Sequence, residues 1–408
     1  MTAVRRILMV HRYYWPDTAP YGRLLQPLAA GIARTGLKVT LFSSQPFYRR
    51  GEAPTRLPAR RLEDGVEVIR CMWRSSRPAG IVRRAAADAL FLVSLALHLL
   101  FRRRYDLVCV STSPPIAAAL VVRALTRVRG SAMIYHVQDV HPEAAVAAGV
   151  LRNGTMAGML RRLDSWTCST ADRMVVLTED MRQALVDRGI RDGAITVINN
   201  SVIPPPDRLR VEHPLTPKPR GAFDVLYAGN LGRYQDLETV VAAAALLRAY
   251  PHIRFLVVGV GVLLPRLKQL SNEMNCHSLR FLGNQPQSVL ESLMQECDLA
   301  LVSQLAGLHR YGFPSKTQGY LAAGCRLLAV VDEPSELATM VRSRQLGVVC
   351  PPGQPGVIAQ AVLELSRQPA WSEKDRSRVR AGAADFSEHI LLRRWATIVQ
   401  QTLPGPRS

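Results

Sequence analysis

The sequence of 408 residues contains no Cys-x-x-Cys pair, and its seven cysteines stand singly between Cys71 and Cys350. Zinc sites and redox-active dithiols use closely spaced cysteines, so the sequence indicates neither. The scatter and the odd number also argue against a disulfide framework. The apolar run Ile7–Val10 is shorter than the roughly 7–15 apolar residues at the centre of a signal peptide. We therefore expect a protein of the reducing cytoplasm.

Lysine and acidic residues are scarce. Only 5 of the 52 basic residues are lysines, and the 32 acidic residues leave a formal net charge of +20. Residues 1–105 hold 19 arginines and lysines against 6 aspartates and glutamates, so most of the excess lies in the first quarter. Arginine is always charged and contacts phosphate at two points. The excess indicates an anionic partner (nucleic acid, an acidic membrane surface or a phosphorylated small molecule), unless it reflects genome base composition.

Repeated apolar stretches of about 20 residues, which a polytopic membrane protein needs, are absent. One segment approaches this length: Ala85–Phe101 has only three polar members and lies between Arg83-Arg84 and Arg102-Arg103-Arg104. It could be a buried helix, a helix in the membrane interface or a spanning helix. A spanning helix would place Asp106 and all that follows across the membrane. We favour the interfacial helix, because basic residues near an anionic leaflet contribute about 1 kcal/mol each.

Strand-like and helix-like segments alternate in two series. Short continuous runs of Val, Ile and Leu suit strands buried on both faces of a parallel sheet. In the first series we expect strands at Arg6–Val10, Lys38–Phe42, Leu107–Val110, Ala132–Val137, Arg173–Leu177 and Ala194–Ile198. In the second we expect them at Asp224–Ala228, Arg254–Val258, Leu279–Leu282, Leu299–Val302, Arg326–Val330 and Gly347–Cys350. This order predicts α/β architecture with two doubly wound, Rossmann-like domains.

A proline-rich segment separates the two series. It includes Pro204-Pro-Pro206, which cannot continue a helix or a central strand. We predict an N-terminal domain at 1–205, a linker at 206–221 and a C-terminal domain at 222–386. A last helix at about 387–401 is expected to pack back on the first domain. The domains would face each other across a cleft, which is the expected active site because ligands bind beyond the carboxyl ends of the strands.

Two loops of the second domain carry candidate phosphate-binding residues. Gly229-Asn-Leu-Gly-Arg233 follows an expected strand and precedes a helix. Its glycines permit close backbone approach, and Arg233 can pair with a phosphate. In Tyr311-Gly-Phe-Pro-Ser-Lys316, the lysine falls in the first turn of a helix. A lysine there is unfavourable unless an anion lies opposite, so we predict a phosphate at Lys316.

Gly259-Val-Gly261 also follows an expected strand. It has no third glycine of a dinucleotide fingerprint, and no acidic residue follows at the spacing that binds a ribose. These absences argue against a nicotinamide enzyme.

Two loops of the first domain carry candidate acceptor-side residues. The loop from His11 to Arg23 is crowded with aromatics and arginine, which suits a sugar or a lipid head group. Gln138-Asp-Val-His-Pro-Glu143 places three ionisable groups within five residues directly after a strand. Asp139 or His141 could contact a reacting hydroxyl. Alternatively, Asp139 caps the following helix.

Taken in order, these motifs resemble the retaining glycosyltransferases of family four in the GT-B superfamily, most of all the bacterial polysaccharide branch of the N-acetyl-fucosaminyltransferase type. The resemblance covers nearly the whole chain. It rests on Tyr14-Trp-Pro16, Ser113-Pro-Pro115, Gln138–Glu143 followed by Gly149-Val-Leu-Arg152, Val197-Ile-Asn-Asn200, Gly229–Arg233, and Pro314-Ser-Lys316 with Leu321-Ala-Ala-Gly324.

The resemblance implies an enzyme that takes a sugar from a nucleotide-diphosphate donor, UDP-linked and N-acetylated. It implies transfer with retention to a lipid-linked saccharide in surface polysaccharide synthesis. It further implies a cytoplasmic protein, peripheral on the anionic inner face of the cytoplasmic membrane. No metal, other cofactor or nucleic acid is implied.

On this basis we predict three sets of site residues. The catalytic residues are Asp139, His141, Arg233 and Lys316. The donor-binding residues are Gly229, Asn230, Gly232, Arg233, Gly283, Asn284, Tyr311, Pro314, Ser315 and Lys316. The acceptor-binding residues are Tyr14, Trp15, Tyr21, Gly22 and Arg23.

The sequence departs from the family pattern at four positions. Tyr311 and Gly319 stand where the family has glutamates, the family's cleft histidine would fall near Gln138, and Gln235 replaces a lysine. The departures leave two other functions open. One is a catalytically weak, membrane-associated scaffold, and the other is an epimerase or hydrolase of sugar nucleotides on the same fold.

Overall fold

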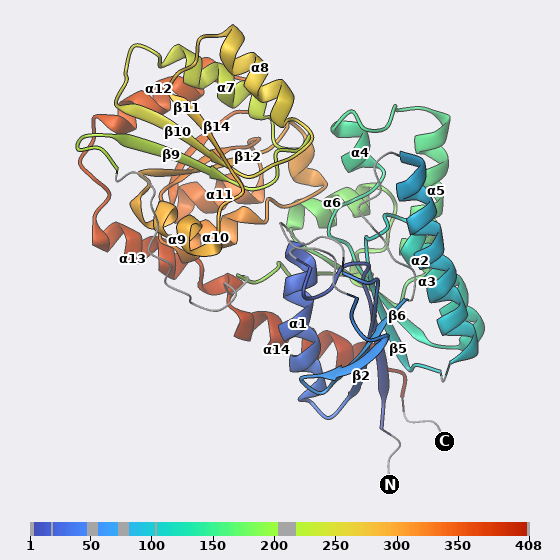
Figure 1. Cartoon of the computed structure of the whole chain (residues 1–408). Helices are drawn as coiled ribbons and strands as arrows, with labels where there is room; N and C mark the ends of the chain where they lie inside the picture. Colours follow the sequence, from blue (N-terminus) through green and yellow to red (C-terminus); the bar gives the residue numbers. More distant parts are fainter. Residues whose placement is uncertain are drawn as a thin grey trace. The chain divides into compact units, whose positions relative to one another are not determined.

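Figure 1 shows the computed structural model of the chain, which describes residues 4–17, 19–46, 56–71, 81–102, 104–202 and 218–405. The chain divides into two compact units. The first comprises Met1–Glu143, Arg152–Ile203 and Glu388–Ser408, and the second comprises Ala144–Leu151 and Pro204–Ser387. Most of the predicted linker lies outside the described residues, so the predicted domain bounds stay a prediction.

The first unit is built on a sheet in the order β3-β4-β2-β1-β5-β6-β7-β8. All neighbouring strands pair in parallel except β3 and β4. The strand order reverses between β1 and β5, and such a reversal is where doubly wound sheets bind ligands. The strands are β1 (Arg6–Val10), β2 (Lys38–Ser43), β3 (Arg60–Glu63), β4 (Val66–Arg70), β5 (Leu107–Ser111), β6 (Ala132–His136), β7 (Arg173–Val176) and β8 (Ile195–Val197).

The hairpin of β3 and β4 is not predicted from the runs of apolar residues. Strand β3 lies at the sheet edge, and its sequence Arg-Arg-Leu-Glu is charged and mostly exposed. Charged side chains are common on edge strands, where they oppose pairing with other chains. Asp64 and Gly65 form the turn, both with positive φ, which matches the Asp-Gly signal of a tight hairpin.

The helices of the first unit pack on both faces of its sheet. Helix α2 packs against α3, and α3 packs against α5, while α1 packs against the C-terminal helix α14 (Figure 1). The helices are α1 (Pro20–Ala33), α2 (Ile81–Phe101), α3 (Ala117–Arg129), α4 (Glu143–Ala147, which spans the division between the units), α5 (Thr155–Thr170), α6 (Glu179–Asp187) and α14 (Glu388–Thr402), with a 3₁₀ turn at Asp192–Ala194.

The second unit is built on a parallel sheet in the order β11-β10-β9-β12-β13-β14. Its order reverses between β9 and β12. The strands are β9 (Phe223–Ala228), β10 (Ile253–Val258), β11 (Leu279–Gly283), β12 (Leu299–Ser303), β13 (Leu327–Val330) and β14 (Gly347–Cys350). The helices are α7 (Leu237–Leu246), α8 (Leu264–Glu273), α9 (Gln287–Glu296), α10 (Lys316–Ala322), α11 (Glu336–Ser343), α12 (Pro355–Ser366) and α13 (Glu373–Gly382), with 3₁₀ turns at Leu308–Arg310 and Ala384–Phe386.

The predicted fold class is confirmed: both units are Rossmann-like, with central strands buried on both faces. The predicted strands recur within one or two residues of their expected bounds. Helix α1 starts at Pro20, because a proline fits the first turn of a helix.

Helix α14 belongs to the hydrophobic core of the first unit. Trp395 is 1% exposed and lies in one cluster with residues of α1 and β1. Gly31 makes room for this helix, since a Cβ there would lie 2.5 Å from Cδ2 of Leu392.

We predict that Trp395→Ala destabilises the first unit by about 3–5 kcal/mol, because it empties a fully buried position. Gln400 is exposed on the same helix, and Gln400→Ala is expected to change stability by less than about 0.5 kcal/mol. Denaturant unfolding of both variants measures the difference. Equal stabilities would contradict the packing of α14 described here.

Candidate active site

The loops after β9 and β10 in the second unit pack backbone against backbone. The amide of Gly229 donates to the carbonyl of Val258 at 2.9 Å. A Cβ on Gly259 would lie 1.9 Å from the Gly229 oxygen, and a Cβ on Gly261 would lie 2.2 Å from the Leu231 oxygen. Gly259 and Gly261, which do not form a dinucleotide fingerprint, therefore allow the two loops to meet at the carboxyl ends of their strands.

Lys316 lies beside these loops. Its Nζ is 4.6 Å from the centroid of the Tyr227 ring, and its Cε is 3.2 Å from the position of a Cβ on Gly229. Burial lowers the pKa of the Lys316 ammonium to about 8, because a charge is poorly solvated there. Within the described part of the chain, no carboxylate pairs with this ammonium. The site therefore holds a cation that an anionic ligand would stabilise.

The glycine loop carries the other predicted donor residues. The amide of Gly232 donates to Oε1 of Gln235 at 3.0 Å, so the side chain that replaces the family's lysine satisfies a loop amide instead. A Cβ on Gly232 would lie 2.5 Å from Nδ2 of Asn230. Asn230 and Arg233 are both exposed at this edge, where Arg233 can reach a ligand.

The remaining predicted donor residues flank the same edge. Gly283 ends β11 and Asn284 follows it, and the carbonyl of Gly283 accepts from the amide of Gly259 at 2.7 Å. Pro314 and Ser315 precede Lys316 at the start of α10, and Ser315 makes no side-chain cap there. Tyr311 follows the 3₁₀ turn and is half-buried. The structure thus gathers the predicted donor residues along one edge of the second sheet.

Polar side chains also gather where the first sheet reverses its strand order. His11 follows β1 and Ser111 ends β5, and His11 Nδ1 lies 2.5 Å from the Ser111 hydroxyl. The Tyr21 ring packs edge-on against His11 at 4.7 Å between centroids. Burial lowers the pKa of His11 to about 3, so this imidazole is neutral at physiological pH.

A hydrogen-bonded chain runs from Tyr21 through His136 and Gln138 to Asn200. The Tyr21 hydroxyl lies 2.7 Å from Nδ1 of His136. Gln138 Nε2 lies 2.7 Å from Nε2 of His136, and Gln138 Oε1 accepts from Asn200 at 2.7 Å. Burial lowers the pKa of His136 to about 3, so the ring is neutral. Because its Nε2 accepts from Gln138, its Nδ1–H donates to Tyr21, whose own proton is left for another acceptor.

The other predicted acceptor residues differ in their exposure. Tyr14 is 1% exposed and packs in the core beside Arg70, so a direct contact with an acceptor would require it to leave the core. Trp15 is 37% exposed. A Cβ on Gly22 would lie 2.9 Å from the carbonyl oxygen of Tyr13, so only glycine fits there. Arg23 is half-buried.

Asp139 and His141 lie on the loop that follows β6. Asp139 is exposed and His141 is half-buried, so both can meet a ligand. The alternative that Asp139 caps the next helix is wrong, because α4 begins at Glu143 and the cap position is therefore Pro142. Across the residues with described positions, no group of three or more His, Cys, Asp or Glu side chains could hold a metal ion.

Comparisons with known proteins agree with the fold and the order of motifs. The family model "Glycosyl transferase 4-like domain" matches residues 21–201, and the model "Glycosyl transferases group 1" matches residues 211–385. The chain is 32% identical to WbjE of Pseudomonas aeruginosa, named a probable glycosyltransferase, over 74% of this chain and 76% of that protein. It is 25% identical to WcaI of Escherichia coli strain K12, a glycosyl transferase named for colanic acid biosynthesis, over 85% and 88%.

A solved structure shares the fold. HepE of Anabaena, in complex with UDP and glucose, aligns with a TM-score of 0.66 at 15% identity, over 97% of this chain and 100% of that one. An identity this low shows the fold alone.

We predict that Lys316 is acetylated first among the five lysines when the protein meets limiting acetic anhydride at pH 7.5. Only the unprotonated amine reacts, and a pKa of about 8 leaves about a quarter of Lys316 neutral, against about 0.1% of an ordinary lysine. Labelling should fall as the pH decreases through 8. Mass spectrometry measures it, with exposed Lys268 as control; labelling of Lys316 no faster than Lys268 would contradict the lowered pKa.

Proposed function

This chain belongs to the group 1 glycosyl transferases with a 4-like N-terminal domain, and from that membership we propose its reaction. It is a glycosyltransferase of bacterial polysaccharide synthesis. The proposed donor is a nucleotide-diphosphate sugar, UDP-linked and N-acetylated. The proposed acceptor is a lipid-linked saccharide, and the anomeric configuration is retained.

Lys316 is the observation that carries the proposal. A half-buried ammonium without a carboxylate partner, beside a loop of close-packed backbone, suits a diphosphate. Exposed Arg233 on the neighbouring loop adds a second cation. The UDP bound to HepE on the same fold is consistent with a nucleotide donor, which we extend to this chain as part of the proposal.

The proposed mechanism rests on stabilising the leaving group. As the bond between the sugar and the diphosphate breaks, negative charge grows on the diphosphate, and Lys316 and Arg233 stabilise that charge. The acceptor hydroxyl attacks from the face that the leaving group occupies, which retains the configuration. Asp139 accepts the proton of this hydroxyl as it attacks, and His141 helps to orient it. The Tyr21 hydroxyl donates a hydrogen bond to the acceptor saccharide, and the exposed ring of Trp15 offers a face for the sugar to stack on.

The outer face of helix α2 supports the proposed contact with a membrane. From Ala85 to Phe101, every exposed side chain is apolar, and Val93 is 56% exposed. The two ionisable groups point inward: Asp88 pairs with Arg12, and His98 Nε2 lies 2.8 Å from the Tyr105 hydroxyl. A helix with polar groups inward and apolar groups outward suits hydrocarbon better than water.

Further apolar side chains are exposed on α3, which packs against α2, and on α5, which packs against α3. Val128 on α3 is exposed, as are Met156, Met159 and Trp166 along one stripe of α5. In the described residues, Val82–Phe101 is the one helix that is long and apolar enough to cross a membrane. Because its inner face is bonded to the first unit, we propose that α2 lies in the interface, so that the protein is peripheral on the inner, anionic leaflet.

Transfer from a panel of nucleotide sugars to a lipid-linked saccharide tests the proposed reaction. NMR of the product should show the anomeric configuration of the donor. Release of free sugar without transfer would indicate a hydrolase, and recovery of an altered nucleotide sugar would indicate an epimerase. Absence of any reaction with donors that bind would favour the scaffold.

We predict that Asp139→Asn keeps donor affinity and lowers turnover by about 10²-fold, because the carboxylate acts on the acceptor hydroxyl. Donor affinity is spared since the donor residues lie in the second unit. Steady-state kinetics with calorimetric donor binding separates the two effects. Full turnover in Asp139→Asn would remove this residue from the chemistry.

We predict that the double variant Val93→Ser/Leu97→Ser loses most of its binding to anionic vesicles, because it removes apolar area from the outer face of α2. Leu246→Ser, which changes an equally exposed leucine on α7, is the control and should bind normally. Binding of the unaltered protein should weaken as salt rises, since arginines at the helix ends contribute charge. Binding that survives high salt and alkaline washing would instead support a spanning helix.

A further inference from the structure

The structure assigns Arg188 as the positioning residue of the loop that carries Asp139 and His141. The inference rests on the proposed function, in which these two residues act on the acceptor. Arg188 donates to the backbone carbonyl of His141 and to the side chains of Glu143 and Asp164. It therefore acts by fixing the backbone between His141 and α4.

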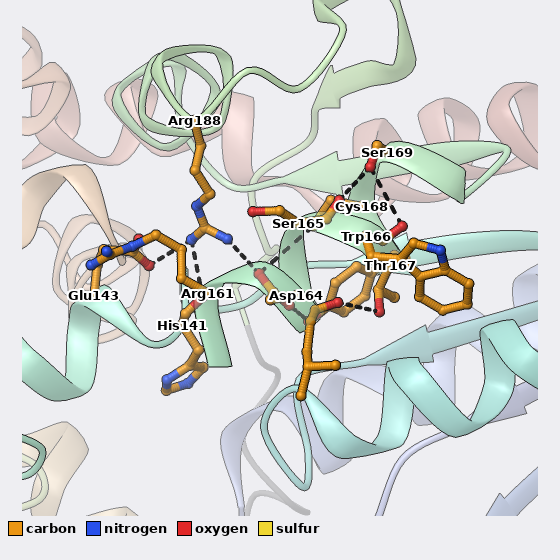
Figure 2. Close-up of polar contacts among 12 residues, drawn as sticks. His141, Glu143, Arg161, Asp164, Ser165, Trp166, Thr167, Cys168, Ser169 and Arg188 are labelled. Atoms are coloured by element: carbon orange, nitrogen blue, oxygen red, sulfur yellow. Dashed lines mark hydrogen bonds and ion pairs between the residues drawn. The ribbon is translucent and has the colours of Figure 1, made fainter. Parts of the chain in front are cut away.

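The guanidinium of Arg188 joins three segments of the first unit. It donates to Oε2 of Glu143 and to Oδ2 of Asp164, both at 2.6 Å, and to the carbonyl oxygen of His141 at 3.0 Å. Figure 2 shows the guanidinium between these groups, with Arg161 on the far side of Glu143. Arg161 donates to Glu143 Oε1 at 2.7 Å. Each oxygen of the Glu143 carboxylate therefore accepts a hydrogen bond from a different arginine.

The other end of the loop is held by different contacts. The amide of Val137 donates to the carbonyl of Val175 at 2.8 Å, and Gln138 is held by Asn200 at 2.7 Å. Between these contacts and the Arg188 contact with His141 only Asp139 and Val140 remain, and Val140 is buried. The backbone at Asp139 is therefore fixed from both sides, and Arg188 supplies one of the two fixed points.

Because the network is ionic, we infer that it fixes the position of the loop rather than adding to the stability of the fold. The Arg188 and Asp164 side chains are 8% and 4% exposed, and burying an ion pair gains little over apolar packing of the same volume. An apolar side chain would not bind the His141 carbonyl. A lysine could not bind all three acceptors in this arrangement, because it has one compact ammonium in place of the planar guanidinium, whose two terminal nitrogens contact them here.

Arg188→Lys tests the inference, with Arg182→Lys as the matched control. Arg182 lies on the preceding helix α6 and also binds two carboxylates, Glu179 and Asp192. Its side chain is 37% exposed, and neither of its partners belongs to the loop at 138–143. In Arg188→Lys we expect amide hydrogen exchange across 138–143 to quicken about tenfold, and kcat to fall about 10- to 100-fold. The donor KM should stay within about twofold, because ground-state donor binding is untouched.

The control Arg182→Lys should change neither exchange nor kcat. Unchanged exchange across 138–143 in Arg188→Lys, whatever its kcat, would overturn the inference. Should Arg188→Lys fail to fold, Glu143→Gln replaces it, since that variant keeps the Arg188–Asp164 pair and loosens only the loop. It should show the same two changes in smaller measure, and normal exchange in a folded Glu143→Gln would also overturn the inference.

The two proposals fail in different ways. Full activity in Asp139→Asn together with quickened exchange in Arg188→Lys would contradict the proposed catalytic role and leave the positioning role intact. Impaired Asp139→Asn together with normal exchange and kcat in Arg188→Lys would contradict the positioning role and leave the proposed reaction intact.

Discussion

A half-buried ammonium without a carboxylate is the constraint on which the second unit depends. Lys316 rests against the Tyr227 ring and the glycine loop, and burial already costs it part of its affinity for a proton. A cation in such a place is stabilised by an anion from outside the fold. A Cβ on Gly229 would lie 3.2 Å from Cε of Lys316, so the absence of a side chain there leaves room for the lysine beside the loop.

The first unit carries different side chains at the corresponding place in its sheet. Its strand order reverses between β1 and β5, as that of the second unit reverses between β9 and β12. Neutral, hydrogen-bonded groups gather there: His11 with Ser111, and His136 between Tyr21 and Gln138. Neutral donors and acceptors suit hydroxyl-rich saccharides, whereas the ammonium of the second unit suits a diphosphate. The division of charge between the units therefore agrees with an acceptor side and a donor side.

The sequence allowed most strands and the anomaly of Lys316 to be predicted, because both depend on local patterns: continuous apolar runs and a lysine at a helix start. The charged edge strand β3 has no such pattern. Tyr227 could not be singled out either, since within an apolar strand it resembles any core aromatic. Contacts between distant segments were equally hidden, because Asn200 meets Gln138 across 62 positions and Arg188 meets Glu143 across 45. Asp139 as a helix cap was excluded only once the start of α4 was known.

Calorimetric titration of the unaltered protein with UDP, UMP and uridine at pH 7 tests most directly whether the second unit holds a diphosphate. UDP should bind about tenfold or more tightly than UMP, because a charge-assisted hydrogen bond to the second phosphate contributes about 1.5–3 kcal/mol. Uridine should bind most weakly of the three. Uridine or UMP binding as tightly as UDP, or no binding of UDP at all, would contradict a diphosphate site at Lys316.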